Sequence, residues 1–324
     1  MANTLLDIIN LRTSFRINRA YYAAVDNVSL SLYKHETLAI VGESGSGKSS
    51  LALSVTRLLN PDYSRVEGII NYGGQNLATL PDTELNKVRG GHIGMIFQDP
   101  LTALNPLMKI GSQIEEGLIY HSELNPQERK ARALELLQNV GIHQPDQAYG
   151  QFPHELSGGM RQRAMIAMAL SNKPALLIAD EPTTALDVTI QAQILDLLRN
   201  QQAATGTSTL LITHDLGVVA ETAHRVAVMY AGQVVELAPC AELFQNPLHP
   251  YTKSLLASIP GTNQARLHTI QGMVPSLQNL PREGCRFAPR MPELPPYSHQ
   301  QEPTLNEAAP GHFVLCTCYK HITE

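Results

Sequence analysis

Short apolar runs alternate along this chain with stretches in which apolar residues recur at helical spacing. Buried strands are predicted at the apolar runs 37–41, 93–97, 175–179 and 208–213. Helices are predicted at 50–59, 126–137, 164–170 and 189–200. This alternation predicts an α/β fold, and the helical stretch at about 100–172 is expected to interrupt the sheet as a subdomain.

Residues 42–49, between the first of these strands and the following helix, match the pattern G-x-x-x-x-G-K-[ST]. Its glycines let backbone N–H groups turn towards phosphate oxygens, and the helix N-terminus adds partial positive charge. Lys48 is expected to bridge the β- and γ-phosphates, and Ser49 to hold Mg²⁺ through its hydroxyl. The pattern predicts a nucleoside triphosphate site, with contacts from Gly42, Ser44, Gly45, Ser46, Gly47, Lys48, Ser49 and Ser50.

Two tyrosines, Tyr21 and Tyr22, are expected on a loop just ahead of this motif. An aromatic side chain at this place could stack on an adenine ring. We assign that role to Tyr22, with Tyr21 as the alternative. A pair of tyrosines that caps a sheet edge is the competing interpretation.

Polar side chains follow three further predicted strands: Gln98, the pair Asp180 and Glu181, and His214. Ligands of α/β sheets bind beyond the carboxyl ends of the strands. We therefore expect Asp180 to hold Mg²⁺, Gln98 to reach Mg²⁺ or the attacking water, and Glu181 to polarise that water. His214 is expected to hydrogen-bond the γ-phosphate. The competing interpretation of Asp180 and Glu181 is that they are simply solvated residues at the end of a strand, without a role in catalysis.

A second potential anion site lies at Ser157, Gly158 and Gly159, which open the helix predicted at 164–170. Unpaired N–H groups at a helix N-terminus attract anions here for the same reason as at Gly47. One triphosphate needs only one such site. The second is therefore expected to serve a nucleotide held by another subunit.

Composition adds limits to this picture. A chain of 324 residues exceeds one compact core, so a large domain with an appendage is predicted. The net charge of −5 gives no reason to expect a nucleic-acid partner. The sequence contains no apolar run of about 18 residues and no signal-peptide pattern at its start, so it is not expected to span a membrane by itself.

Taken together, the motifs resemble the ATP-binding subunits of ABC transporters over roughly residues 4–260. In that family's terms they are the Walker A loop (42–49), the Q-loop glutamine (Gln98), an LSGGQ-type signature with Met160 as its last residue (156–160), the Walker B strand with the catalytic glutamate (176–181), the D-loop (185–187) and the H-loop histidine (His214). The resemblance implies a P-loop NTPase core with a mixed sheet and a helical subdomain, within an ABC ATPase domain at 1–260. It also implies hydrolysis of ATP with Mg²⁺, in which Glu181, His214 and Gln98 are catalytic.

A narrower resemblance, to the dipeptide/oligopeptide/nickel importer branch, is carried by residues 96–106, 229–236 and 249–256. It implies import of di- or oligopeptides, with nickel, metallophore complexes or opines as alternative cargoes. It also implies a short C-terminal domain at 261–324, for which the concentration of prolines favours an irregular fold or a docking segment.

Several members of that branch carry an iron–sulfur cluster on four cysteines of this domain. Here Cys285 and Cys316 match, but Met291 and Ser298 stand at the other two positions, and Cys318 is extra. A four-thiolate site cannot be built from the matching positions. We therefore expect a tail without a cluster, unless His299, His312 or Cys318 substitutes.

The resemblance further implies a head-to-tail pair of ATPase subunits, each ATP lying between the phosphate loop of one and the Ser157–Gly159 turn of the other. The expected partners are a second homologous ATPase subunit in a heterodimer, two transmembrane permeases docked on the segment after Gln98, and an extracytoplasmic substrate-binding protein. The chain would then be peripheral, on the cytoplasmic face of the inner (plasma) membrane.

Three other functions are disfavoured. A soluble ABC ATPase of DNA repair or the ribosome would need a coiled-coil insertion or two cassettes, and the sequence has neither. A regulatory subunit that does not hydrolyse ATP is opposed by the intact Glu181 and His214. An exporter is opposed by the importer-type tail.

Overall fold

The computed structural model describes residues 3–183, 188–258, 272–281, 283–291, 302–316 and 320. Contacts divide the chain into two compact units. The first comprises Met1–Leu5, Tyr33–Glu36 and Thr79–Ile212, and we call it the helix-rich unit. The second comprises Leu6–Leu32, Thr37–Ala78 and Thr213–Glu324, and we call it the phosphate-loop unit.

One sheet of the phosphate-loop unit is formed early in the chain. Its order is β2 (Ala20–Tyr33), β1 (Thr4–Ile17), β4 (Ser64–Tyr72) and β5 (Gln75–Asn76). β1 pairs antiparallel with β4, so that Leu6 lies opposite Tyr72 and Ile8 opposite Ile70. Leu6, Ile8 and Ile70 are fully buried, as expected for the inward face of a sheet that is solvated on its other side.

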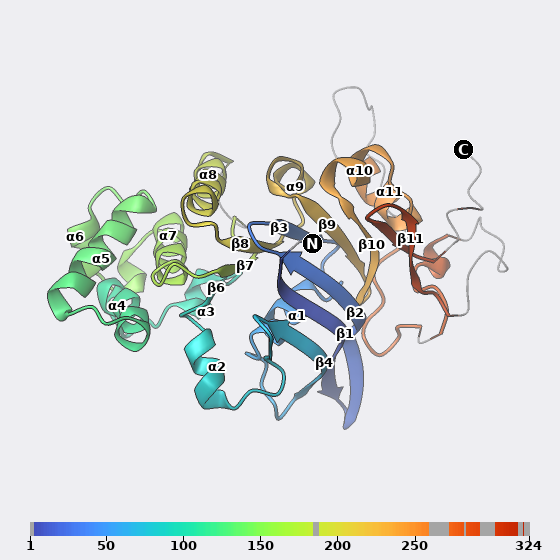
Figure 1. The fold of residues 1–324 in the computed structure, drawn as a ribbon, viewed down its shortest axis with the longest axis horizontal. Helices are drawn as coiled ribbons and strands as arrows, with labels where there is room; N and C mark the ends of the chain where they lie inside the picture. The colour runs from blue at the N-terminus through green and yellow to red at the C-terminus, as the bar shows by residue number, and fades with distance from the viewer. Residues whose placement is uncertain are drawn as a thin grey trace. The chain divides into compact units, whose positions relative to one another are not determined.

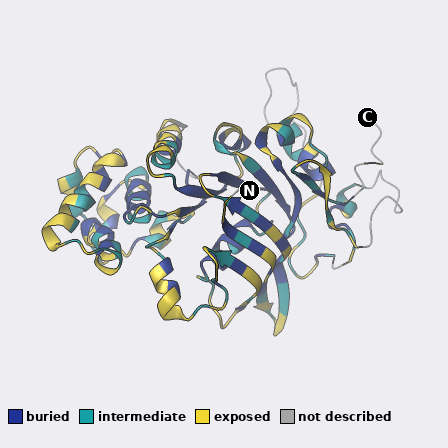
Figure 2. Ribbon diagram, viewed as in Figure 1, coloured by how far each residue is buried: buried dark blue, intermediate teal, exposed yellow. Residues whose placement is uncertain are grey.

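The other strands of this unit are β3 (Thr37–Val41), β9 (Arg225–Tyr230), β10 (Gln233–Pro239), β12 (His312–Leu315) and β11 (Leu305–Ala309). β3 pairs parallel with β9, whereas β9 with β10, β10 with β12 and β12 with β11 pair antiparallel. β3 and most of β9 and β10 are buried, which Figure 2 shows as continuous dark blue ribbon. The same unit contains helices α1 (Lys48–Val55), α9 (Leu216–Thr222), α10 (Cys240–Gln245) and α11 (Pro250–Ala257), and the 3₁₀ turn η2 (Ala288–Arg290).

The C-terminal residues are more regular than their proline content suggests. β11 and β12 form a hairpin, with Gly311 in its turn at φ +73°. In β12, His312 and Val314 point inward and are buried, because this strand pairs with β10 at Val314 and Phe313. The irregular fold expected for 261–324 is therefore wrong for 305–315, where strand alternation outweighs composition.

The helix-rich unit contains three parallel strands, β6 (Ile93–Ile96), β7 (Leu176–Asp180) and β8 (Ser208–Ile212), with β7 between the other two. Its helices are α2 (Asp82–Val88), α3 (Pro100–Ala103), α4 (Ile110–His121), α5 (Pro126–Asn139), α6 (Pro145–Gly150), α7 (Gly158–Ala169) and α8 (Val188–Thr205), with the 3₁₀ turn η1 (Pro153–Glu155). Helices α4 to α7 lie together in Figure 1. The start of α5 is fixed locally, because Asn125 and Glu128 form a capping box.

Parallel and antiparallel pairing thus coexist in an α/β chain, and the fold class predicted from the sequence is confirmed. Among the described helices, none combines the length and apolar character needed to cross a bilayer.

Candidate nucleotide-binding site

The phosphate loop runs from the end of β3 to the start of α1, as the sequence pattern predicts. Gly42 and Gly47 adopt φ of +154° and +101°, and a Cβ would lie 2.1 Å from the Met229 carbonyl oxygen at the first and 2.4 Å from the Ala24 carbonyl oxygen at the second. Only glycine allows this close backbone approach. Ser44 and Gly45 are exposed at the loop tip, whereas Ser46 is buried beneath it.

Lys48 lies across the inside of its own loop. Its Nζ donates hydrogen bonds to the carbonyl oxygens of Gly42, at 2.7 Å, and Glu43, at 3.0 Å, and lies 3.5 Å from Ser46 Oγ. The ammonium is therefore held by oxygen atoms of its own loop. The glycine backbone, the buried cation and the Ser49 hydroxyl are together a chemically suitable set for a triphosphate with Mg²⁺.

The two tyrosines differ from the expected arrangement. Tyr21 and Tyr22 lie within β2, not on a loop, because the period-2 alternation of this region begins earlier than the apolar run suggests. The Arg65 guanidinium lies 3.8 Å from the centre of the Tyr21 ring. The Tyr21 ring thus has a cation–π partner, and the stacking of Tyr22 on adenine stays a prediction.

In the helix-rich unit, Gln98 and Glu181 are brought together at the ends of neighbouring strands. β6 pairs parallel with β7, Ile96 lying opposite Ala179, and the two side chains follow directly. Gln98 Nε2 donates a hydrogen bond to Glu181 Oε2 at 3.1 Å. Asp180 is 4% exposed at the last position of β7. A carboxylate pair and a carboxamide thus gather at one sheet edge, as expected for strand ends.

Glu181 also has an uncommon backbone conformation. Its φ is +48°, in the left-handed region, and its N–H donates to the Ile212 carbonyl oxygen at 2.8 Å. Such a conformation in a residue other than glycine is found disproportionately at functional sites. The carbonyl oxygen of the neighbouring Pro182 accepts a 2.6 Å hydrogen bond from Nε2 of the buried Gln162 of α7. This bond connects the segment that follows β7 with the helix that begins at the Ser157–Gly159 turn.

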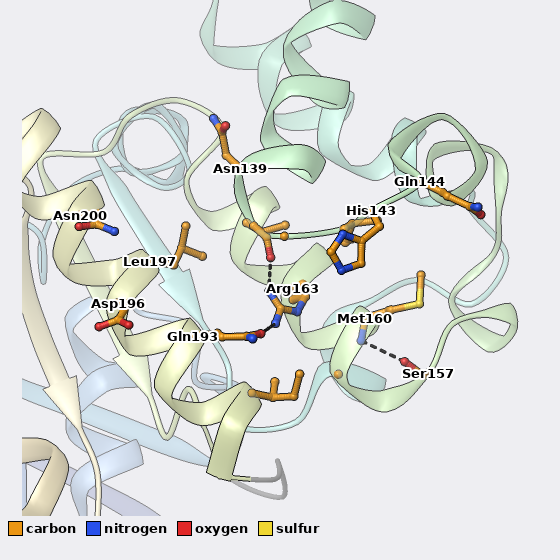
Figure 3. Close-up of a pocket in the computed structure, with 15 residues that line it drawn as sticks. Asn139, His143, Gln144, Ser157, Met160, Arg163, Gln193, Asp196, Leu197 and Asn200 are labelled. Carbon is orange, nitrogen blue, oxygen red and sulfur yellow. Dashed lines mark hydrogen bonds between the residues drawn. The ribbon is translucent and has the colours of Figure 1, made fainter.

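The signature turn is open to solvent. Ser157 is the N-cap of α7 and its Oγ accepts from the Met160 N–H at 3.3 Å. Ser157 and Gly158 are exposed, and nothing lies within 4 Å of a Cβ built at Gly158. Figure 3 shows Ser157 and Met160 at one side of a cavity of about 1050 Å³ between α5, α7 and α8.

Arg163 spans this cavity and was not singled out by the sequence. It donates to the Val140 carbonyl oxygen, and its Nη2 donates to Gln193 Oε1 at 2.5 Å (Figure 3). Its place in the chain, six residues after Ser157 on the same helix, is the only local signal. The D-loop residues 185–187 lie outside the described residues.

His214 belongs to the phosphate-loop unit, just before α9. The adjacent Asp215 is the N-cap of α9, and its Oδ1 accepts from Gly217 N at 2.9 Å and from Val218 N at 3.2 Å. The sequence placed His214 at a strand end, and the structure agrees, since β8 ends at Ile212.

The two matching cysteines lie in an apolar core. Cys285 and Cys316 are buried in one hydrophobic cluster, against which Met291 packs. His312, an expected substitute ligand, is instead paired with Glu236, its Nε2 lying 2.7 Å from Oε1. Ser298, His299 and Cys318 are outside the described residues. Two thiols and a thioether do not fit a four-thiolate cluster, and within the described part no three His, Cys, Asp or Glu side chains are grouped for a metal.

This fold, with its glycine-rich loop and its acidic strand end, defines a P-loop nucleotide-binding cassette. The family model "ABC transporter" matches residues 25–184, and "Oligopeptide/dipeptide transporter, C-terminal region" matches residues 235–294. The chain belongs to the family of ATP-binding subunits of ABC transporters, in the branch with the oligopeptide/dipeptide-type C-terminal region. The resemblance inferred from the motifs is confirmed, and the activity of the chain is that of an ATPase.

Similar proteins cover nearly the whole chain. The oligopeptide transport ATP-binding protein AppD of Bacillus subtilis is 49% identical over 98% of each chain. The oligopeptide transport ATP-binding protein OppD of Lactococcus lactis subsp. cremoris is 48% identical over 98% of this chain and 95% of its own. Among solved structures, the dimeric ATP-binding cassette MJ0796 bound to ADP and Pi matches with a TM-score of 0.66 and 30% identity, over 73% of this chain and 99% of that one.

Proposed function

We propose that this chain binds ATP at Gly42–Ser49 and hydrolyses it with Glu181 to drive import of di- or oligopeptides. The observation that carries the catalytic assignment is the 3.1 Å hydrogen bond from Gln98 Nε2 to Glu181 Oε2, beside the buried Asp180. The peptide assignment is supported by the C-terminal region and by the relatives named for peptide transport. Nickel, metallophore complexes and opines are the alternative cargoes.

The residues divide the reaction between them. Lys48 and the loop N–H groups would bind the phosphates, and Tyr22 would stack on adenine. Ser49, Gln98 and Asp180 would hold Mg²⁺, which when bound would neutralise charge on the phosphate oxygens. Glu181 would accept a proton from the attacking water, and the Gln98 amide orients the carboxylate for that task. His214 would donate a hydrogen bond to the γ-phosphate.

The exposed Ser157–Gly159 turn supports a shared site. Its N–H groups at the start of α7 would bind the γ-phosphate of an ATP held by a second ATPase subunit. We infer that this partner is a homologous subunit in a heterodimer, which serves two permeases and an extracytoplasmic binding protein. The chain would then be peripheral on the cytoplasmic face of the inner (plasma) membrane.

The segment after Gln98 is suited to bind a permease. Leu101 and Leu107 expose 61% and 86% of their surface on either side of the short turn that follows α3. We assign these two exposed leucines to the surface that a permease would cover. Because Gln98 precedes them directly, movement of this segment would be transmitted to Glu181 through the Gln98–Glu181 hydrogen bond.

The test is a purified Glu181→Gln chain, followed by light scattering as Mg-ATP is added. Blocked hydrolysis traps a closed pair, so doubling of mass would show that the chain pairs with itself and would contradict the heterodimer. A constant mass with ATP bound is the expected result, and adding the homologous subunit should then produce a dimer. Lys48→Ala is the control: if it binds ATP as tightly as the parent chain, the assignment of the phosphate loop is wrong.

Cargo is tested in cells that lack this chain. Uptake of a labelled dipeptide should return with the wild-type chain and not with Glu181→Gln. If dipeptide uptake is unchanged by the deletion and uptake of labelled nickel is lost, the peptide assignment is wrong.

A further inference from the structure

A short C-terminal segment, residues 283–291, contacts the phosphate loop through an arginine. Arg290 Nη1 lies 2.6 Å from Glu43 Oε2, and Nη2 lies 3.3 Å from Oε1 of the same carboxylate. Glu43 is the second residue of the phosphate loop. The Arg290 side chain is 5% exposed and that of Glu43 is 28% exposed. The pair is thus a bidentate ion pair that is largely removed from water, the strong form of this interaction.

Arg290 is itself held in place by aromatic rings. Its guanidinium carbon lies 5.6 Å from the centre of the Phe287 ring and 5.7 Å from that of Tyr230. These rings and Tyr251 pack against one another, with centroid distances of 4.7–5.4 Å. An arginine in such a setting has little rotamer freedom to lose when it pairs with Glu43.

The Glu43 backbone is fixed from the same side. Its N–H donates to the Tyr251 hydroxyl at 2.8 Å, and its carbonyl oxygen accepts from Lys48 Nζ at 3.0 Å. Tyr251 is fully buried, and burial raises its pKa above the ordinary value, so the hydroxyl stays neutral. The side chain of Glu43 and its backbone N–H are therefore held by residues that follow β10.

A second arginine of the segment supports the other side of the loop. Arg286 Nη1 donates to the Ala231 carbonyl oxygen at 2.6 Å, and the same guanidinium pairs with Asp26 of β2. The next residue, Gly232, donates its N–H to the Ser46 carbonyl oxygen at 2.9 Å. Arg286 thus braces the turn between β9 and β10 on which the phosphate loop rests.

The electrostatic consequence follows from the charge of Glu43. A carboxylate within a loop that binds a polyanion repels that anion, and the repulsion is larger near a protein surface of low effective dielectric constant than in water. The positive charge of Arg290, 2.6 Å from the carboxylate, opposes this repulsion. The arginine therefore reduces the electrostatic repulsion between the Glu43 carboxylate and the phosphates of ATP, which would otherwise lower the affinity for ATP.

We propose that Arg290 is a positioning residue for ATP binding, through which the C-terminal segment sets the affinity of the phosphate loop. Within the segment 283–291, which carries Cys285, the contacts to the phosphate loop and its support are made by Arg290 and Arg286. This inference rests on the proposed role of Gly42–Ser49, and its test separates the two.

The experiment measures equilibrium binding of Mg-ATP to the full-length chain by titration calorimetry. Arg290→Ala should weaken binding about tenfold, a typical size for coupling between adjacent charged groups and a ligand. Arg290→Lys should recover part of the loss. The double variant Arg290→Ala with Glu43→Gln should bind within about threefold of the parent chain, because the repulsive charge is gone.

Three further variants complete the test. Glu43→Gln alone should bind ATP at least as tightly as the parent chain, which keeps the inference testable if Arg290→Ala fails to fold. Arg132→Ala is the control for the loss of an arginine. It removes the 2.8 Å ion pair between Arg132 and Glu135 of α5, in the helix-rich unit, and should leave the affinity for ATP unchanged. Lys48→Ala should abolish binding, and if it does not, the loop assignment itself is wrong.

Two results would overturn the inference while leaving the loop assignment intact. The first is parental affinity in Arg290→Ala together with loss of binding in Lys48→Ala. The second is weakened binding in Arg290→Ala that Glu43→Gln does not restore, since a purely structural bracing role would not respond to the removal of one charge.

Discussion

Gln98 Nε2 donates a 3.1 Å hydrogen bond to Glu181 Oε2, which joins residues 83 positions apart in the sequence. The contact exists because β6 and β7 are adjacent parallel strands whose side chains emerge at the same edge. It gives the carboxylate a fixed orientation, and it connects that carboxylate with the exposed segment that follows Gln98.

Gln98→Ala should lower the rate of ATP hydrolysis about 10- to 100-fold, with a smaller effect on ATP affinity, because Glu181 loses its orienting partner. The measurement is steady-state ATPase activity of the assembled transporter, with kcat and KM determined separately. In a Glu181→Gln background the same substitution should have little further effect on the rate. Additive losses would show that the two side chains act independently.

Gly47→Ala should abolish ATP binding and destabilise the chain by about 1–3 kcal/mol. The new Cβ would lie 2.4 Å from the Ala24 carbonyl oxygen at a residue whose φ is +101°. Urea unfolding and calorimetric ATP binding measure the two effects. Gly150→Ala is the matched control, because nothing lies within 4 Å of its Cβ and it should leave both quantities unchanged.

Stability should fall as pH falls from about 6.5 to about 4, because His249 is buried and neutral. Burial lowers its pKa from 6.5 to about 4, against the smaller opposite influence of Glu236 and Cys316. The unfolded chain therefore binds a proton that the folded chain does not, in the window between these values. The loss amounts to at most about 3.4 kcal/mol.

His249→Asn tests this assignment. His249 Nδ1 accepts from Tyr251 N–H at 3.1 Å as the N-cap of α11, and asparagine can cap without titrating in this range. Urea unfolding at several pH values should show a flatter profile in the variant. An unchanged slope between pH 4 and 6.5 would place the titrating group elsewhere.

Glu236→Leu should destabilise the phosphate-loop unit by about 3–5 kcal/mol. The fully buried carboxylate accepts hydrogen bonds from Leu248 N at 2.8 Å and His249 N at 2.9 Å, and lies 2.7 Å from His312 Nε2. Its loss leaves these donors unpaired and removes the side-chain link between His312 of β12 and β10. Thermal unfolding measures the cost, and Glu221→Leu on α9 is the control, for which a comparable loss would argue against a special role of Glu236.

Leu107→Ser should reduce the ATPase activity that the permeases stimulate while leaving the melting temperature unchanged. Leu107 is 86% exposed, so its removal costs the isolated chain little. Basal and permease-stimulated rates, compared in the same membranes, distinguish the two contributions. Ile9→Ser, at an exposed position of β1, should change neither rate.

Local chemistry made much of this protein predictable. The strand–loop–helix of 37–55 and the helices α5 and α7 depend on residues within a few positions of one another, so turn chemistry and hydrophobic period suffice to predict them. Composition gave a wrong prediction at the C-terminus. The prolines suggested an irregular chain, whereas residues 312–315, which alternate between buried and partly exposed side chains, form a strand.

Tertiary structure alone decided the contacts between distant residues. Arg290 meets Glu43 across 247 positions, and His312 meets Glu236 across 76, because strand pairing and the packing of aromatic rings bring these segments together. No local pattern predicts such a pairing, because the residues next to an arginine or a histidine do not indicate whether its side chain faces water or a buried carboxylate. The sequence by itself determined that the chain binds and hydrolyses ATP, whereas the packing of the fold decided which side chains hold the phosphate loop in place.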